Sequence, residues 1–107
     1  MVALRRFDVH LSAPDPTLGS EIRKTRPCVI VSPDEANESL NTVVIAPLTS
    51  TLRGYPTRVR LRFQGKNGEV AVDQVRAVDK RRLIKRLGTI SEDAKTRLTA
   101  TLLEFFA

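Results

Sequence analysis

The stretch Thr25-Arg26-Pro27-Cys28-Val29-Ile30-Val31-Ser32-Pro33 places one charged residue directly before a run of apolar, mostly β-branched residues. The continuously apolar part, residues 27–31, predicts a strand that is buried on both faces. Pro27 biases the backbone of Arg26 toward an extended conformation. A small β-fold sets reactive groups at its rim in this way, because a polar side chain at the end of a buried strand reaches solvent.

Two later blocks repeat this design. Ile45-Ala46-Pro47-Leu48-Thr49-Ser50 is an apolar run that ends in two hydroxyls, and residues 72–79, Val-Asp-Gln-Val-Arg-Ala-Val-Asp, interleave apolar with charged positions. If residues 69–75 form a strand, alternation puts Asp73 on one face and Gln74 and Arg76 on the other. The three blocks therefore supply an arginine, two hydroxyls and a mixed polar group to one small fold.

The rest of the chain predicts further strands and two helices. Alternation of Phe7, Val9 and Leu11 with polar residues predicts a half-buried strand that leaves His10 on the surface. Apolar or alternating runs predict strands over residues 42–48, 57–63, 69–75 and 84–90, with a hairpin turn at residues 65–68, Gly-Lys-Asn-Gly. A short helix follows Ser32 as its N-cap and ends near Leu40.

Ser91 is predicted to cap a final helix, and a stripe at helical spacing faces the core: Ala94, Leu98, Leu102 and Phe105. These elements predict a mainly β protein with short helices. The architecture is a small antiparallel β-barrel with a C-terminal helix packed on it, formed as one domain by residues 1–107.

Composition and charge narrow the function. The single cysteine, Cys28, lies in an apolar run, and one cysteine forms no internal disulfide, so we expect a reducing compartment, the cytoplasm. No stretch approaches the ~20 apolar residues of a membrane span, so we expect no membrane partner. Residues 1–50 carry a net charge of −1 and residues 51–107 carry +7. A basic half favours a polyanionic partner such as nucleic acid, the alternative being a solvated cationic surface.

The three blocks, in this order and spacing, resemble the MazF/PemK (Kid) family of toxin endoribonucleases. The resemblance also includes Asp15-Pro16-Thr17-Leu18-Gly19-Ser20-Glu21 upstream and Arg86-Leu87-Gly88-Thr89-Ile90-Ser91 downstream, so it covers almost the whole chain. It implies an SH3-like barrel, shared with CcdB, and the toxin of a type II toxin–antitoxin system. It also implies a homodimer, a single-stranded RNA substrate, and an acidic antitoxin with which the toxin binds DNA.

RNA cleavage without a metal needs a base for the ribose 2′-OH, a donor for the charge that grows on the phosphate, and an acid for the leaving oxygen. No metal-ligand cluster or cofactor motif is present in the sequence, so we expect neither a metal nor a cofactor. The resemblance implies that Arg26 is the main catalytic residue, with Thr49 as its partner. Glu21, Ser50 and Asp73 are candidates for support or acid–base work; Asp73 could equally form a structural salt bridge.

Other polar residues are candidates for contacts with RNA, namely Ser20, Lys24, Arg53, Tyr55, Arg58, Gln74 and Arg76. A wider set of cations gives the electrostatic footprint: Arg53, Arg58, Arg60, Arg62, Lys80, Arg81, Arg82, Lys85 and Arg86. Tyr55 is the one aromatic expected to be exposed for base stacking, and filling a turn is an equally good role for it. Kid-like members carry a basic residue and a histidine where this chain has Ala71 and Ser20, so a His/Arg/Asp acid–base set is not available.

Two other classes of function remain open from the sequence. One is a CcdB-like toxin that inhibits DNA gyrase by protein contact, which needs no Arg/Thr pair at a strand end. The other is a basic barrel that binds nucleic acid without cutting it. His10 has the pKa of a general base, but its mid-strand position predicts an ordinary surface histidine.

Overall fold

The computed structural model describes residues 3–14 and 25–107, and within them the chain is mainly β, as predicted. The strands are β1 (Asp8–Ser12), β2 (Arg26–Ile30), β3 (Thr42–Thr49), β4 (Arg58–Phe63), β5 (Lys66–Ala71), β6 (Arg76–Asp79) and β7 (Leu83–Thr89). The helices are α1 (Asp34–Ser39) and α2 (Glu92–Phe106), with short 3-10 turns η2 (Val72–Gln74) and η3 (Lys80–Arg82). The predicted short helix, C-terminal helix and last strand are confirmed.

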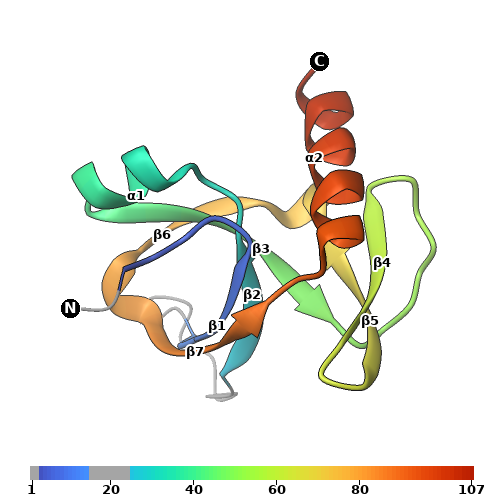
Figure 1. Cartoon of the computed structure of the whole chain (residues 1–107), viewed down its shortest axis with the longest axis horizontal. Coiled ribbons are helices and arrows are strands. Elements are labelled where there is room, and N and C mark those ends of the chain that lie inside the picture. The colour runs from blue at the N-terminus through green and yellow to red at the C-terminus, as the bar shows by residue number, and fades with distance from the viewer. Residues whose placement is uncertain (1–2, 15–24) are drawn as a thin grey trace.

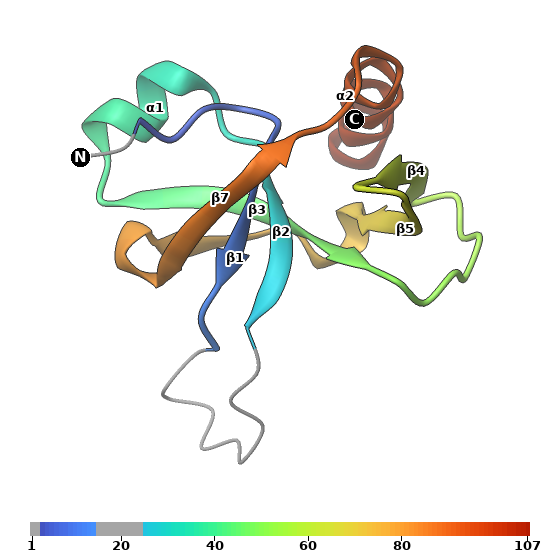
Figure 2. The same cartoon turned by 60° about the horizontal axis from the view of Figure 1, so that its bottom comes forward.

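The strands form an antiparallel sheet in the order β4-β5-β3-β2-β1-β7, with β6 pairing to β3. The long strand β3 is the centre of this arrangement. Its first half pairs with β6 through Thr42–Ile45, and its end pairs with β5 through Leu48 and Thr49. In Figures 1 and 2, β3 crosses from the α1 and β6 side of the molecule to the β4–β5 hairpin. One strand therefore joins both parts of the fold.

The sheet curls until its two end strands, β4 and β7, approach each other. The Gln64 side chain, just after β4, donates a hydrogen bond to the Leu87 carbonyl of β7 at 3.0 Å. A Cβ on Gly88 would lie 3.2 Å from the Phe63 ring, so glycine allows this close contact. Side chains thus link the ends of a half-barrel, and the predicted antiparallel barrel with a C-terminal helix is confirmed.

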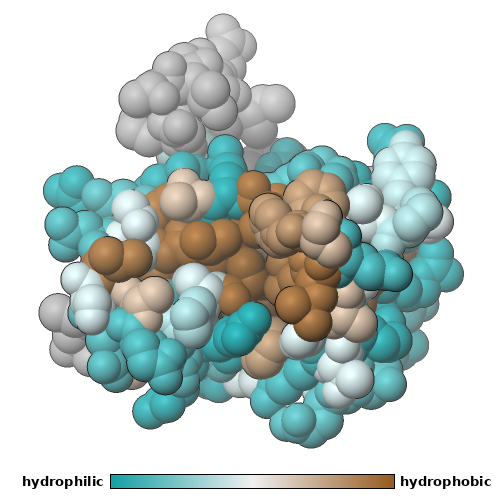
Figure 3. All heavy atoms as spheres, turned by 90° about the horizontal axis from the view of Figure 1, so that it is seen from above, coloured by the Kyte–Doolittle hydropathy of each residue, from teal (hydrophilic) through white to brown (hydrophobic). Residues whose placement is uncertain are grey.

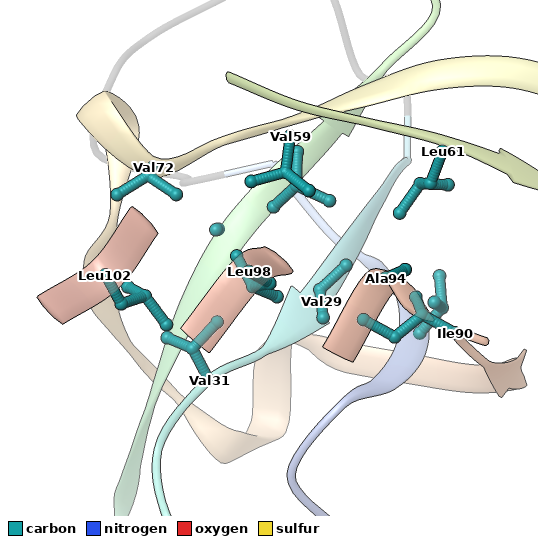
Figure 4. Packing of buried hydrophobic residues seen from close by; sticks show 12 residues of the cluster. Val29, Val31, Val59, Leu61, Val72, Ile90, Ala94, Leu98 and Leu102 are labelled. Atoms are coloured by element: carbon teal, nitrogen blue, oxygen red, sulfur yellow. The ribbon is translucent and has the colours of Figure 1, made fainter. Parts of the chain in front are cut away.

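The larger core lies between α2 and the sheet. Ser91 caps α2 by accepting a hydrogen bond from the Ala94 N–H at 3.2 Å. Ala94, Leu98 and Leu102 are buried against valines from β2, β4 and β5, as Figure 4 shows. Phe105 was predicted to extend this stripe and does not, because its side chain is 42% exposed at the end of the helix.

A second, smaller core covers the opposite face of β2 and β3. It contains Cys28, Ile30, Val43, Ile45 and Val78, with Leu4 and Leu83 packed against it. Strand β1 is buried on both faces: Val9 lies in the larger core, and His10, the next residue, is also buried. The prediction of a half-buried first strand with a surface His10 is therefore wrong: His10 is 3% exposed.

Two turns differ from the sequence prediction. Phe63 pairs with Lys66, so the β4–β5 turn consists of Gln64 and Gly65, both with positive φ, rather than residues 65–68. Gly68 lies inside β5 instead. The predicted strand over 69–75 stops at Ala71 and passes into η2, so Asp73 and Gln74 lie in a 3-10 turn and do not alternate on a sheet.

Candidate active site at the end of strands β2 and β3

The register of β2 and β3 brings the predicted catalytic pair to one strand end. Cys28 pairs with Pro47, Val29 with Ala46 and Ile30 with Ile45. If this antiparallel register continued for two more residues, Arg26 would lie opposite Thr49, and directly opposed residues share a face of the sheet. Arg26 is exposed and Thr49 is half-buried. A phosphate at this edge would meet a guanidinium and a hydroxyl together.

The Thr49 hydroxyl has a defined hydrogen-bond role. Its Oγ1 accepts a hydrogen bond from the Thr51 N–H at 3.1 Å. With one lone pair used in this way, the hydroxyl hydrogen is free to donate outward. Thr49 and Ser50 also line a hollow of about 220 Å³ whose walls are largely apolar, with Pro27, Leu48 and Phe63 among its lining residues.

Gly68 sets the distance between the β4–β5 hairpin and the end of β3. A Cβ at this position would lie 3.0 Å from the Thr49 carbonyl oxygen and 3.3 Å from a Leu48 methyl. We expect Gly68→Ala to displace the Thr49 backbone and to lower kcat for RNA cleavage by about tenfold, since small misplacements at a reacting centre are costly. Single-turnover kinetics on a variant that is folded by circular dichroism would test this. An unchanged rate would show that β3 tolerates the shift.

An ion network fills the space behind the loop that follows Thr49. The Glu69 carboxylate is 1% exposed and accepts hydrogen bonds from the Arg53 N–H at 2.9 Å and the Gly54 N–H at 2.8 Å. Arg58 lies 3.5 Å from Glu69 and donates two hydrogen bonds to Asp73, through Nε at 2.8 Å and Nη2 at 3.2 Å. Thr57 also donates to Asp73 at 2.9 Å.

This network fixes the contacts of two residues that the sequence suggested for the site. Asp73 forms the structural salt bridge that the sequence left open, and the hydrogen bond from Arg58 lowers the pKa of Asp73 below its ordinary value. Such a carboxylate is a weak proton acceptor at neutral pH. Arg58 was predicted to contact RNA, but its side chain is only 7% exposed and its donors face Asp73 and Glu69. The structure gives it a supporting position.

The remaining predicted residues divide into groups. Arg53 and Tyr55 are exposed on the loop that follows Ser50, next to the strand end. Arg76 pairs with Ile45, four residues along β3 from Thr49, which is about 13 Å at the rise of a strand. Arg76 and Gln74 are exposed there, apart from the Arg26 and Thr49 end. Ser20, Glu21 and Lys24 lie outside the described residues.

Several cations of the predicted footprint are held by neighbouring groups. Arg86 donates to Asp8 at 2.9 Å, Arg82 donates twice to the Ala13 carbonyl, and Arg81 pairs with Asp79. The hydrogen bond from Arg81 lowers the pKa of Asp79 below its ordinary value. These contacts order the basic half of the chain, while Arg60, Arg62 and Lys85 remain exposed.

His10 is buried beside the second core, where its Nε2 atom has no hydrogen-bond partner among the residues that the structure describes. Burial lowers its pKa below the ordinary value of 6.5; Arg86 acts in the same direction and Asp8 opposes it. The folded protein keeps His10 neutral while the unfolded chain takes up a proton, so the stability that this residue contributes is complete above pH 6.5 and is lost as the pH falls toward the folded pKa.

We therefore expect the Tm to fall as the pH is lowered from 7 to 5, and His10→Leu to reduce this fall. Calorimetry at a series of pH values measures it. Equal slopes in the two proteins would assign the acid sensitivity to other groups.

One surface feature was missed by the sequence reasoning. Large apolar side chains lie exposed at the end of α2, Leu103 at 70% and Phe106 at 67%. They border a hollow of about 660 Å³ that also involves Val31, Val44 and Val75. Figure 3 shows this apolar surface gathered on one face of the molecule. The signal in the sequence was the run Leu102-Leu103-Glu104-Phe105-Phe106, which is too apolar for a helix with a single buried stripe.

No three His, Cys, Asp or Glu side chains gather as metal ligands among residues 3–14 and 25–107. Cys28 is buried, and its burial raises the pKa of the thiol to about 11, so it is not a nucleophile at neutral pH. In the described part of the chain no helix has the length and apolarity needed to cross a membrane.

Together, the curled antiparallel sheet and the C-terminal helix define a small β-barrel protein, and Arg26 and Thr49 lie at one end of its β2–β3 ladder. Residues 5–106 match the model of a family described as the PemK-like, MazF-like toxin of type II toxin–antitoxin systems. The chain belongs to this family.

Individual relatives agree with this assignment. The endoribonuclease MazF of Staphylococcus epidermidis is 34% identical over 95 residues, which are 83% of this chain and 79% of the relative. A solved MazE-MazF structure (Form-II) from Deinococcus radiodurans has a TM-score of 0.85 at 25% identity, covering 99% of this chain and 97% of that one. An endoribonuclease in complex with its cognate antitoxin, from a Mycobacterial species, shares the fold, with a TM-score of 0.81 at 24% identity, covering 97% and 95% of the two chains.

Proposed function

We propose that this toxin is a metal-independent, sequence-selective endoribonuclease that cleaves single-stranded mRNA. The observation that supports the proposal is the antiparallel β2–β3 pairing, since Arg26 begins β2 and Thr49 ends β3 at the same end of this ladder. The name of the Staphylococcus epidermidis relative, endoribonuclease MazF, supports the same activity. The Arg/Thr pair favours a nuclease over a CcdB-like toxin that acts by protein contact alone.

In the proposed reaction the ribose 2′-oxygen attacks the adjacent phosphorus and the bond from phosphorus to the 5′-oxygen breaks. The 2′-OH proton passes to a base, and the leaving 5′-oxygen receives a proton. The products are a 2′,3′-cyclic phosphate and a 5′-OH. Arg26 stabilises the charge on the equatorial oxygens in a bidentate manner, and the Thr49 hydroxyl, oriented by the Thr51 N–H, donates to one of them. DNA has no 2′-OH, so it is not cut by this route.

The substrate strand extends from this strand end along the exposed loop with Arg53 and Tyr55. Arg53 contacts a phosphate and Tyr55 a base, while Ser50 supports the scissile group. Gln74 and Arg76 are placed to contact a more distant part of the strand. Ser20 and Lys24 complete the proposed RNA contacts, and Glu21 is the further acid–base candidate.

The proposed partners follow from charge and apolar surface. An acidic antitoxin complements the exposed cations around the strand end and competes with RNA for them. The structures of relatives described as MazE-MazF and as an endoribonuclease with its cognate antitoxin support such a complex. The apolar face with Leu103 and Phe106 fits a second copy of the chain, which gives a homodimer. The cytoplasm, where mRNA is found, is the proposed compartment, and the toxin–antitoxin complex is the proposed DNA-binding form.

The decisive experiment incubates the purified chain with a long single-stranded RNA in EDTA and maps the ends. Discrete cuts that leave cyclic-phosphate and 5′-OH ends are expected. Intact RNA that migrates as a slowed band would replace the nuclease with a non-cutting binder. Unaffected RNA together with inhibition of DNA gyrase would favour the CcdB-like function. Loss of cutting in EDTA, restored by a divalent cation, would contradict metal independence.

A further inference from the structure

The loop between β3 and β4, residues 50–57, is held from behind by a buried carboxylate. Both Glu69 oxygens accept hydrogen bonds from this loop, from the N–H groups of Arg53 and Gly54. Glu69 itself pairs with Thr49 in the β3–β5 ladder. One residue therefore connects the backbone at the catalytic strand end with the loop that leaves it. In Figure 1 this loop extends outward beside β4.

The same carboxylate also lies next to Arg58, the residue that packs against Tyr55. The Arg58 guanidinium lies 3.5 Å from Glu69 and is fixed on its other side by Asp73. It stacks over the Tyr55 ring at 5.1 Å from the ring centroid, and the Arg58 N–H donates to the Tyr55 carbonyl at 2.9 Å. Tyr55 is still 49% exposed. Its ring is thus held in place by a buried cation while much of its surface remains open to solvent.

A surface turn does not require a buried ion pair of this kind, whose charges lose hydration free energy when they leave water. A turn-filling tyrosine needs no buried ion pair beneath it, and a buried carboxylate is retained only where its partners satisfy it. The Arg53 N–H, first among several donors, lowers the pKa of Glu69 below its ordinary value, so the carboxylate remains charged through the physiological pH range. A rigid aromatic ring beside a phosphate site is the feature on which single-stranded nucleic acids stack their bases.

We propose that Glu69 is a positioning residue that presets Tyr55 as a stacking platform for an unpaired nucleobase next to the scissile phosphate. This inference rests on the proposed function, because it places the platform within the same RNA path. Preorganisation of this kind improves binding, since the loop and the ring are ordered before the strand arrives. Glu69 acts through Arg58 and the loop backbone and does not touch the RNA.

The chain offers a direct optical test, because Tyr55 is its one tyrosine and it has no tryptophan. The intrinsic emission of the full-length protein therefore reports on Tyr55 alone. We would titrate the protein with a short mixed-sequence single strand of 2′-deoxynucleotides, which has bases and phosphates but no 2′-OH. A base stacked on the ring quenches its emission, so we expect a saturable loss of tyrosine fluorescence in the native protein.

Substitutions can distinguish a loss of Tyr55 positioning from a general loss of folded structure. Glu69→Gln keeps the shape of the side chain and removes its charge; we expect about tenfold weaker binding and a smaller quench. Tyr55→Ala, followed through a dye on the oligonucleotide, should weaken binding by a similar factor, while Tyr55→Phe retains affinity. The double variant should bind no worse than Tyr55→Ala alone, because both changes remove one interaction. Glu35→Gln, at an exposed glutamate, is the matched control and should bind as the native protein does.

If Glu69→Gln does not fold by circular dichroism, Arg58→Lys replaces it, because lysine keeps the charge and loses the planar fork beneath the ring. RNA kinetics add a second readout: Glu69→Gln should raise KM about tenfold and leave kcat within twofold. A native protein that shows no quench, a Glu69→Gln protein that quenches normally, or additive losses in the double variant would overturn the inference. Quenching without RNA cleavage would contradict the proposed nuclease activity and still support the stacking role of Tyr55. Cleavage without quenching would support the nuclease activity and contradict the stacking role.

Discussion

We expect Arg26→Ala to reduce kcat for RNA cleavage by about a thousandfold. Arg26 and Thr49 lie at the same end of the β2–β3 ladder, and in the proposed reaction the Arg26 guanidinium faces the phosphate oxygens that gain charge in the transition state. Loss of one such donor removes stabilisation that exists only in the transition state, so kcat falls much more than RNA affinity. Cleavage of a mapped site, measured under single-turnover conditions, gives the value.

Two further variants make this test specific. Arg26→Lys keeps the positive charge but loses the planar fork, so only a small part of the rate should return. Arg5→Ala removes a solvent-exposed arginine from the N-terminal segment, where it makes a long 3.9 Å pair with Asp34, and should cut as the native protein does. If Arg26→Ala retained cutting while His10→Ala lost it, the assignment of the site to this strand end would be wrong.

Leu98→Ala is expected to cause the largest loss of stability. Leu98 is fully buried in the middle of α2, where it packs in the core shown in Figure 4. Removal of its methyl groups leaves a cavity between the helix and the sheet, which costs about 3 kcal/mol of the free energy of unfolding and lowers the Tm by roughly 15 °C. Thermal unfolding followed by circular dichroism measures the change.

The matched control is Leu40→Ala, the same substitution at a leucine that is 54% exposed after α1. It should change the Tm by no more than a few degrees, since little apolar area leaves the interior. Comparable losses in the two variants would mean that α2 is not packed on the sheet as described.

Much of the fold was predictable because the buried strands of the core consist mostly of apolar, β-branched residues. The apolar run of residues 27–31 overlaps the central strand β2 (Arg26–Ile30), and Ser91 marks the start of α2. His10 and Phe105 were misplaced for a common reason. The periodicity of apolar residues describes one helix or strand at a time. The burial of β1 on both faces and the exposure of the last turn of α2 depend on elements that are distant in the sequence.

The candidate site shows the same limit. Arg26 and Thr49 were found from strand ends in the sequence, and the β2–β3 register supports their meeting. Asp73 and Arg58 were assigned possible roles at the substrate because charged residues on a strand look available to solvent. Their mutual hydrogen bonds and the burial of Glu69 arise from the β4–β5 pairing and the turn that follows it. No residue pattern within a single segment encodes that contact.

The shared strand β3 has a consequence for how such proteins diversify. Because β3 is hydrogen-bonded to β2, β5 and β6, three strand pairings fix the position of Thr49, the proposed catalytic hydroxyl. The loop that follows Thr49 is held instead by individual contacts with Glu69, Arg58 and Asp73. The sequence of this loop, and with it the RNA sequence that is recognised, can therefore change while the proposed catalytic residues keep their positions. Exchanging residues 51–56 between relatives should transfer preference for a cut sequence as a module, at little cost to turnover.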